Sequence, residues 1–149
     1  MGGAFGDGEW NKQSVVKNVE KSETESTVTG KALFARAGIS HSDVDVCFVY
    51  DHFTPLVLMA IEELGFCKRG EGGDFVSDGK LLWPNGGLPL NTSGGNRSEG
   101  YIHGMENVVE AVRQLRGDAI NQVDGAEVAP QYVSFHKAAG APPLPLKGI

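Results

Sequence analysis

Two segments of the chain gather side chains that could do chemistry. The first is YDHFTP at residues 50–55, which brings together a phenol, a carboxylate, an imidazole and a hydroxyl. The second is GGLPLNTSGGNRSEGYIHG at residues 86–104, called here the glycine segment. Glycine lets a backbone take positive φ and approach a ligand closely. The glycine segment therefore predicts a ligand-binding loop, although the pattern alone does not name the ligand.

Known phosphate-binding patterns do not describe the glycine segment. It lacks the Gly-Lys-Ser/Thr of a Walker loop. It also lacks the GxGxxG spacing, placed tightly after a strand, that marks a dinucleotide site. The pattern therefore indicates a ligand loop of neither of these two kinds.

The elements around residues 50–55 place them at a position typical of ligand sites. A helix is predicted from Thr27 to a stop at Gly38, followed by a buried strand at residues 44–50 (VDVCFVY). A second helix is predicted from Pro55. The segment thus joins the carboxyl end of a strand to a helix N-terminus, which favours an oxyanion or phosphate.

A purely structural role for the same residues is the alternative. Asp51 or Thr54 would cap the second helix, and Phe53 would belong to the core.

The second half of the chain continues the alternation of helices and strands. Residues 68–90 form a long glycine-rich loop, and MENVVEAVRQLRG at residues 105–117 predicts a helix. Its apolar face is predicted to carry Val108, Val109, Val112 and Leu115. A short strand is expected within residues 121–129, whereas the prolines of residues 138–149 disfavour another. This order predicts an α/β fold with a layered mixed sheet.

Composition excludes several classes of function. The net charge of -6 argues against nucleic-acid binding, which needs a basic surface. The two cysteines, Cys47 and Cys67, lie in apolar surroundings and show no metal-ligand spacing, so we expect reduced thiols and no metal. We see neither a signal-peptide pattern nor an apolar run near eighteen residues. A cytoplasmic protein without a membrane span is therefore expected.

A family resemblance adds what these patterns cannot supply. Residues 86–117, followed by QVDGAE, closely resemble the thiolase-like lipid-transfer proteins, relatives of the sterol-carrier-protein thiolases. YDHFTP resembles their paired motif, and the resemblance covers residues 27–129. It implies the C-terminal half of the thiolase fold, a layered α/β/α arrangement with a mixed sheet.

The same resemblance suggests a division of the chain. Residues 27–135 would form the thiolase-like domain, after a poorly ordered or non-homologous start at residues 1–26. Residues 136–149 would form a tail rich in proline and glycine.

The chain departs from thiolases at the motif positions. Tyr50 stands where the resemblance places an asparagine or histidine, and Tyr101 stands where it places the histidine of a Gly-His-Pro motif. The cysteine expected near residues 127–133 is absent, and the nucleophilic cysteine would belong to an N-terminal half. Claisen condensation needs a thiolate and a base, so ordinary thiolase chemistry is disfavoured.

The resemblance instead implies chemistry of the steroid side-chain retro-aldolase type. Tyr50 and Tyr101 would be the acid and base, in an order that the sequence leaves open, with His103 as a catalytic neighbour. An alternative for His103 is a structural polar residue beside a helix start. The residues expected to bind substrate are Asp51, His52, Asn91, Gly94, Gly95 and Ser98.

The implied substrate is a lipid or steroid acyl-CoA, with no cofactor. The implied partners are an N-terminal thiolase half, a second copy of the chain and a small OB-fold protein. Because one half would hold only one wall of the site, the chain alone is expected to be inactive. An acetyl-CoA acetyltransferase-like half, a non-catalytic acyl-CoA or lipid-binding half, and a truncated inactive fragment are the alternatives.

Overall fold

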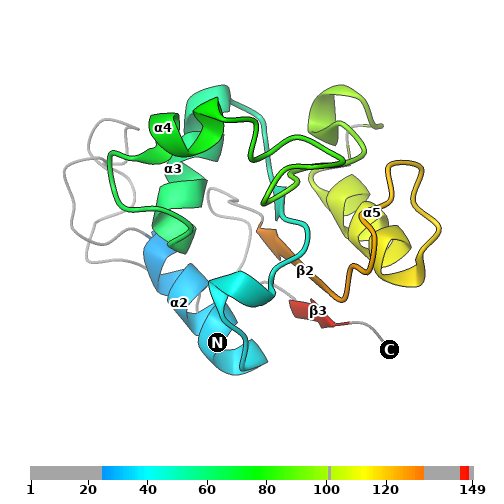
Figure 1. Cartoon of the computed structure of the whole chain (residues 1–149), viewed down its shortest axis with the longest axis horizontal. Coiled ribbons are helices and arrows are strands. Elements are labelled where there is room, and N and C mark those ends of the chain that lie inside the picture. The colour runs from blue at the N-terminus through cyan, green and yellow to red at the C-terminus, as the bar shows by residue number, and fades with distance from the viewer. Residues whose placement is uncertain (1–24, 101, 133–144, 148–149) are drawn as a thin grey trace.

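The computed structural model describes residues 25–100, 102–132 and 145–147, in which helices lie on both sides of a small sheet (Figure 1). The helices and 3-10 turns are α2 (Glu25–Ala37), η2 (His41–Asp43), α3 (Thr54–Leu64), α4 (Gly72–Ser77), η3 (Gly95–Arg97) and α5 (Met105–Arg116). The strands are β1 (Phe48–Val49), β2 (Val128–Tyr132) and β3 (Pro145–Lys147).

The described part of the sheet is mixed, as the sequence predicts. Its strand order is β1-β2-β3. β1 runs parallel to β2, with Phe48 opposite Gln131, and β2 runs antiparallel to β3, with Ala129 opposite Leu146. A parallel pair needs a crossover connection, and here α3, α4, the glycine segment and α5 all lie between β1 and β2.

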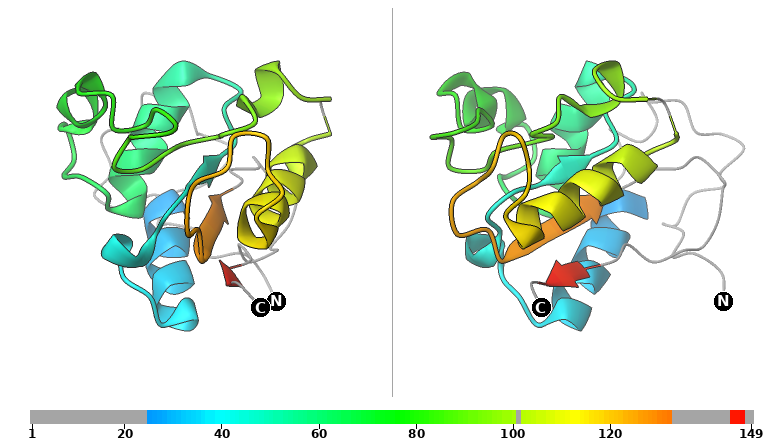
Figure 2. Two further views of the ribbon diagram at one scale, coloured as in Figure 1. Left: turned by 45° about the vertical axis from the view of Figure 1, so that its right-hand side comes forward. Right: turned by 90° about the vertical axis from the view of Figure 1, so that its right-hand side faces the viewer.

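Two hydrophobic clusters lie on opposite sides of β1. In the first, Cys47 and Val49 pack with side chains of α2 and α3. In the second, Val46 and Phe48 pack with Ala111 of α5 and with β2. Alternate residues of an extended segment point to opposite faces, which explains the division. The two turned views show α5 on one side of the sheet and α2 on the other (Figure 2), confirming the layered α/β/α arrangement.

The predicted strand at residues 44–50 is buried as expected, but its ladder is shorter. Only Phe48 and Val49 form β1, and Cys47 adds an isolated bridge to Leu90. Side chains replace strand partners at both ends. The Asp45 carboxylate accepts hydrogen bonds from the backbone amides of Glu127 and Val128, both at 2.9 Å. The apolar pattern thus predicts burial correctly and overestimates strand length.

Helix α3 begins and ends close to its predicted bounds, but its start differs from the capping alternative. Phe53 is the N-cap residue, without a side-chain cap, and 64% of it is exposed. Neither Asp51 nor Thr54 caps the helix, and Phe53 is not in the core. Gly65 ends the helix at φ 89°, which favours glycine.

The predicted loop at residues 68–90 contains more structure than expected. It includes α4, whose first residue, Gly72, donates its amide to the Glu62 carboxylate of α3 at 2.9 Å. Further along, the amide of Leu88 donates to the Lys80 carbonyl at 2.8 Å. The prediction of an irregular loop was wrong for α4, because tertiary contacts with α3 stabilise a helix that its glycines disfavour.

The strands of the C-terminal region also differ from prediction. β2 begins only at Val128, late in the expected range of residues 121–129. β3 forms despite the prolines of the tail. Pro145 is the first residue of β3, a strand at the end of the described sheet, and proline is tolerated at that position.

The inner face of α5 is the largest departure from the sequence prediction. Val109 is 44% exposed, and Val108, Val112 and Leu115 are only half-buried. The fully buried positions are instead mostly polar; they are Glu106, Asn107, Glu110, Ala111 and Gln114. Leu115 packs against the second cluster as predicted, but polar groups take most of the other buried positions, because they find hydrogen-bond partners in the neighbouring loops, which removes the cost of burying them.

Candidate functional site

Tyr50 lies at the carboxyl end of β1, at the centre of the predicted site. It is 6% exposed, and its ring centroid is 4.9 Å from that of His52. The His52 ring in turn lies 4.9 Å from the ring of the exposed Phe53. The chain therefore leaves the sheet edge through a row of aromatic rings that runs from the core towards the surface.

Asp51 holds the glycine segment against this sheet edge. Its Oδ1 accepts hydrogen bonds from the Asn96 backbone amide at 3.0 Å and from Asn96 Nδ2 at 2.6 Å. Gly95 adopts φ 66°, and a Cβ there would overlap the Asp51 carboxylate. Glycine is required at this position by both conformation and space. The structure thus brings two predicted ligand residues, Asp51 and Gly95, into contact with each other.

Asn91 supports the backbone immediately before Tyr50. Its Oδ1 accepts the Val49 amide, and its Nδ2 donates to the Val49 carbonyl, both at 2.9 Å. Asn107 of α5 also donates to this carbonyl, at 3.4 Å. Asn91 itself adopts φ 48°, a left-handed conformation that asparagine tolerates better than most residues. The side chain of Asn91 therefore pairs with β1 as a neighbouring strand would.

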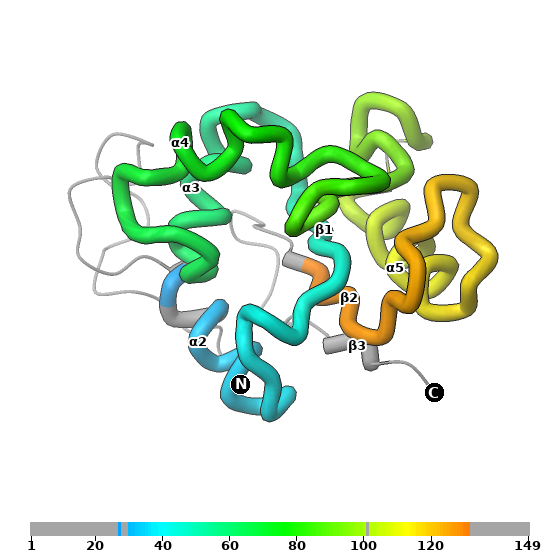
Figure 3. Tube along the Cα trace, viewed as in Figure 1, coloured from blue at the N-terminus to red at the C-terminus, as the bar shows by residue number. Residues whose placement is uncertain are grey.

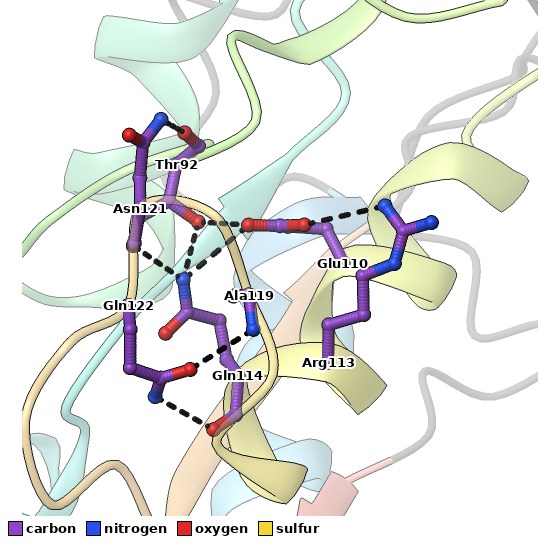
Figure 4. A network of polar contacts seen from close by, with 7 residues as sticks. All are labelled: Thr92, Glu110, Arg113, Gln114, Ala119, Asn121 and Gln122. Carbon is purple, nitrogen blue, oxygen red and sulfur yellow. Dashed lines mark hydrogen bonds and ion pairs between the residues drawn. The ribbon is translucent and has the colours of Figure 1, made fainter.

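The polar face of α5 fixes the glycine segment from behind. Thr92 Oγ1 donates to Glu110 at 2.8 Å and accepts from Gln114 Nε2 at 2.9 Å (Figure 4). Gln114 also donates to the Asn121 carbonyl at 2.8 Å, and Asn121 Nδ2 donates to the Thr92 carbonyl at 2.6 Å. Sequence reasoning missed this network. The signal was the polar stripe of α5 at helical spacing, which lies outside the predicted apolar face.

The N-terminus of α5 is occupied by the side chain of Glu106, a residue in its first turn. Both carboxylate oxygens of Glu106 accept the Gly104 amide at 3.0 Å, and Gln131 of β2 donates to the Gly104 carbonyl at 2.7 Å. A carboxylate at this position interacts favourably with the helix dipole. An external anion would have to displace Glu106, so the open helix start beside the site is that of α3.

The remaining predicted site residues lie at different places. His103 is exposed, with φ 54°, and Ser98 is exposed beside Gly94. Tyr101 lies outside the described residues, as do most of residues 1–26 and 136–149. The glycine segment passes alongside β1 (Figure 3), so Asp51, His52, Asn91 and Gly95 share the edge where Tyr50 lies.

Neither thiol has the environment of an activated nucleophile. Burial raises the pKa of Cys47 to about 12. Desolvation, followed by the negative charges of Glu62 and Glu71, also raises the pKa of Cys67. Both groups are therefore protonated at neutral pH. A thiolate nucleophile would need the opposite shift of pKa.

Within the described ranges, no three His, Cys, Asp or Glu side chains are grouped so that they could hold a metal ion. In the same part of the chain, no helix has the length and apolar character needed to cross a membrane.

Residues 8–134 match the model of the family described as thiolase C-terminal domain-like. The chain belongs to this family. Its fold and the order of its motifs agree with this membership, so the expected resemblance is confirmed.

Two relatives of this thiolase C-terminal domain-like chain are named as a lyase and as a side-chain-cleaving aldolase. The chain is 48% identical over 103 residues to a 17-hydroxy-3-oxo-4-pregnene-20-carboxyl-CoA lyase of Mycobacterium tuberculosis, covering 69% of this chain and 26% of that protein. It is 52% identical over 98 residues to a steroid side-chain-cleaving aldolase of Thermomonospora curvata, covering 66% and 25%. The chain therefore spans about a quarter of the length of these relatives.

A solved aldolase structure is also similar to this chain. The chain is similar to an Ltp2-ChsH2(DUF35) aldolase, with a TM-score of 0.73 and 44% identity, over 78% of this chain and 31% of that one. A more distant relative is sterol carrier protein 2 of Rattus norvegicus, 34% identical over 127 residues, covering 83% of this chain and 23% of that protein.

Proposed function

We propose that this chain is the C-terminal part of an enzyme that cleaves a carbon–carbon bond in a steroid or other lipid acyl-CoA by a retro-aldol reaction. The identities of 48% and 52% to a lyase and an aldolase support the proposal. The observation that carries it is Tyr50, a buried phenol at the end of β1 beside the glycine segment. Thiolases keep a different polar residue at the matching motif position.

The proposed reaction divides into two proton transfers around one bond cleavage. A base removes the proton of a β-hydroxyl group, and the oxygen becomes a carbonyl as the Cα–Cβ bond breaks. The electron pair of that bond passes into the thioester enolate, and an acid returns a proton to Cα. The products are a ketone or aldehyde and a shortened acyl-CoA. Because no electrons are gained or lost overall, the step requires no redox cofactor.

Tyrosines suit the two proton transfers. A phenol ordinarily titrates at a pKa of about 10, so it can donate a proton at neutral pH, and it can accept one where its surroundings lower the pKa. In this proposal Tyr50 and Tyr101 are the acid and base, in either order, and His103 lies near Tyr101 in the chain. The His52 ring lies against the Tyr50 ring, with 4.9 Å between the centroids.

The outer face of α5 supports a partner for this half. Met105 and Val109 lie one helical turn apart on that face and are 55% and 44% exposed, and Ile102 just before the helix is 58% exposed. Exposed apolar stripes of this kind usually meet another protein surface. We propose that the N-terminal half of the thiolase fold packs there, because about three quarters of the length of each relative lies outside the part that aligns with this chain.

The activity is tested by supplying the missing half. The chain is co-expressed with the N-terminal part of the Thermomonospora curvata aldolase, and the purified assembly is given a steroid β-hydroxyacyl-CoA. We expect cleavage, and we expect Tyr50→Phe to lower kcat by about 100-fold or more. Ser77→Ala, which removes a hydroxyl from α4, is the matched control. Equal rates for parent and Tyr50→Phe would overturn the role of Tyr50. Binding without cleavage would favour an acyl-CoA-binding half.

The proposed interface has its own test. Val109→Asp places a charge in the apolar stripe and should prevent co-purification of the two halves, because an unpaired buried charge is costly. Ile120→Asp alters a 93% exposed residue in the loop after α5 and serves as the control. Loss of association for Ile120→Asp but not for Val109→Asp would move the interface to that loop. We also propose that the assembly contains a second copy of this chain and binds an OB-fold partner. Sedimentation gives the mass of the assembly and so tests both.

A further inference from the structure

We propose that Asn91 and Asn96 are positioning residues that clamp the two neighbours of Tyr50, the Val49 backbone and the Asp51 side chain, so that the glycine segment sets the place of the phenol. The inference rests on the proposed function, because it assumes that Tyr50 transfers a proton. It gives Asn91 a role different from the direct substrate contact expected from its position in the motif.

The first half of the clamp acts on Val49. Both polar atoms of the Asn91 side chain are committed to the Val49 amide and carbonyl, at 2.9 Å each. Asn91 is 9% exposed, so its amide faces the protein rather than an open cleft. One N–H and one lone pair of the amide remain, but both belong to a buried side chain whose orientation is fixed by the bonds to Val49. Its effect is to fix the peptide unit that leads directly into Tyr50.

The second half acts on Asp51. The Asn96 backbone and side-chain amides both donate to Asp51 Oδ1, and Gly95 lies close to the same carboxylate. Hydrogen bonds to a charged acceptor are shorter and stronger than those between neutral groups, in line with the 2.6 Å distance from Asn96 Nδ2. Residues on either side of Tyr50 are therefore held by the same short segment.

The clamp is itself anchored. Thr92, next to Asn91, bonds to Glu110 and Gln114 of α5, and Asn121 bonds the Thr92 carbonyl. A displacement of the glycine segment would break these bonds as well as those to β1. Precise placement matters because a small misplacement of a catalytic group costs much of its rate.

The test uses the two-half assembly described above. Asn91→Asp keeps the size of the side chain and an acceptor for the Val49 amide, but it removes the donor to the Val49 carbonyl. We expect kcat to fall by about 10- to 100-fold with KM within about twofold of the parent. Asn96→Gly retains the backbone bond to Asp51 and removes the side-chain bond, so its loss should be smaller.

Two further variants control for charge and folding. Asn85→Asp makes the same chemical change at an exposed residue just before the glycine segment and should leave kcat unchanged. Asn91→Gly preserves the left-handed backbone while removing the amide, and it should also lower kcat. A raised KM with unchanged kcat for Asn91→Asp would identify a substrate contact and overturn the clamp. A kcat equal to that of Asn85→Asp would overturn it as well.

A spectroscopic readout separates this inference from the proposed function. The assembly is labelled with 3-fluorotyrosine, and the Tyr50 signal is assigned from its loss in Tyr50→Phe. The clamp predicts that Asn91→Asp moves the Tyr50 fluorine resonance and that Asn85→Asp does not. An unmoved resonance refutes the clamp even where the enzyme is active. A moved resonance in an assembly that cleaves nothing supports the clamp and refutes the enzymatic role.

Discussion

Helices α3 and α5 lie on opposite sides of β1 and are built on opposite plans. α3 buries apolar side chains, Ala60, Ile61 and Leu64. α5 buries mostly carboxylates and amides and exposes Met105 and Val109. One helix follows the usual rule for amphipathic helices, and the other reverses it.

The difference shows that the two helices have different structural roles. Apolar burial is favourable but non-directional, so the buried apolar face of α3 stabilises the layer without selecting one position for a neighbouring loop. Hydrogen bonds have direction, so the inner face of α5 selects one position for Thr92 and for the loop around Asn121. Met105 and Val109 of α5 are then available to another surface.

The largest expected effect is a loss of stability when the buried apolar face of α3 is altered. Ile61→Ala removes a fully buried side chain from α3 and should lower the free energy of unfolding by about 2–5 kcal/mol. Val109→Ala on the outer face of α5 should change it by no more than about 0.5 kcal/mol in the chain alone. Urea unfolding followed by circular dichroism measures both. Similar losses for the two variants would show that the outer face of α5 is covered within the chain itself.

The next effect is a loss of stability when the buried polar face of α5 is altered. Gln114→Leu keeps the approximate volume of a side chain that is 1% exposed, but it leaves Thr92, Asn121 and the Val123 amide without their partner. Each buried polar group left unsatisfied costs about 1–3 kcal/mol. Because the surrounding structure relaxes and recovers part of this cost, we expect the free energy of unfolding to fall by about 3 kcal/mol in total. Arg113→Gln, at a 3.9 Å ion pair with a half-exposed arginine, should cost less than about 1 kcal/mol. A stabilised Gln114→Leu would mean that α5 gains nothing from its polar face.

The smallest effect is a pH dependence of the α3-side cluster. Because burial raises the Cys47 pKa from 9.0 to about 12, the folded state holds this proton more tightly than the unfolded state. Its contribution to stability is fully present below pH 9 and is lost as the pH rises from 9 towards 12, at about 1.4 kcal/mol per pH unit. The measurement compares Cys67→Ser with the Cys47→Ala/Cys67→Ser double variant by urea unfolding at pH 8 and pH 10. Parallel pH profiles would contradict burial of the thiol.

Local patterns in the sequence predicted most of the elements. The helix breakers Gly38, Gly65 and Gly117 end the three long helices where expected, because each follows a periodic segment directly. The β-branched and aromatic run before Tyr50 predicted a buried segment. The motif order predicted the family, the mixed sheet and the proximity of the glycine segment to the end of β1.

Long-range polar partners could not be predicted in the same way. The bond between Asn91 and Val49 joins residues 42 positions apart, and that between Asp45 and Val128 joins residues 83 apart. An asparagine or aspartate in a glycine-rich or turn-like stretch suits a ligand contact, a cap or a distant backbone equally well. Only the path of the chain in space decides among these partners.

The sequence by itself determined the family, the alternation of helices and strands, and the residue types available at the site. These depend on local propensity and on motifs, which are contiguous in the chain. The tertiary structure decided which face of α5 is buried and which atoms Asn91, Asp51 and Thr92 contact. It did so because burying a polar group is favourable only where a partner is already in place, and that partner comes from elsewhere in the fold.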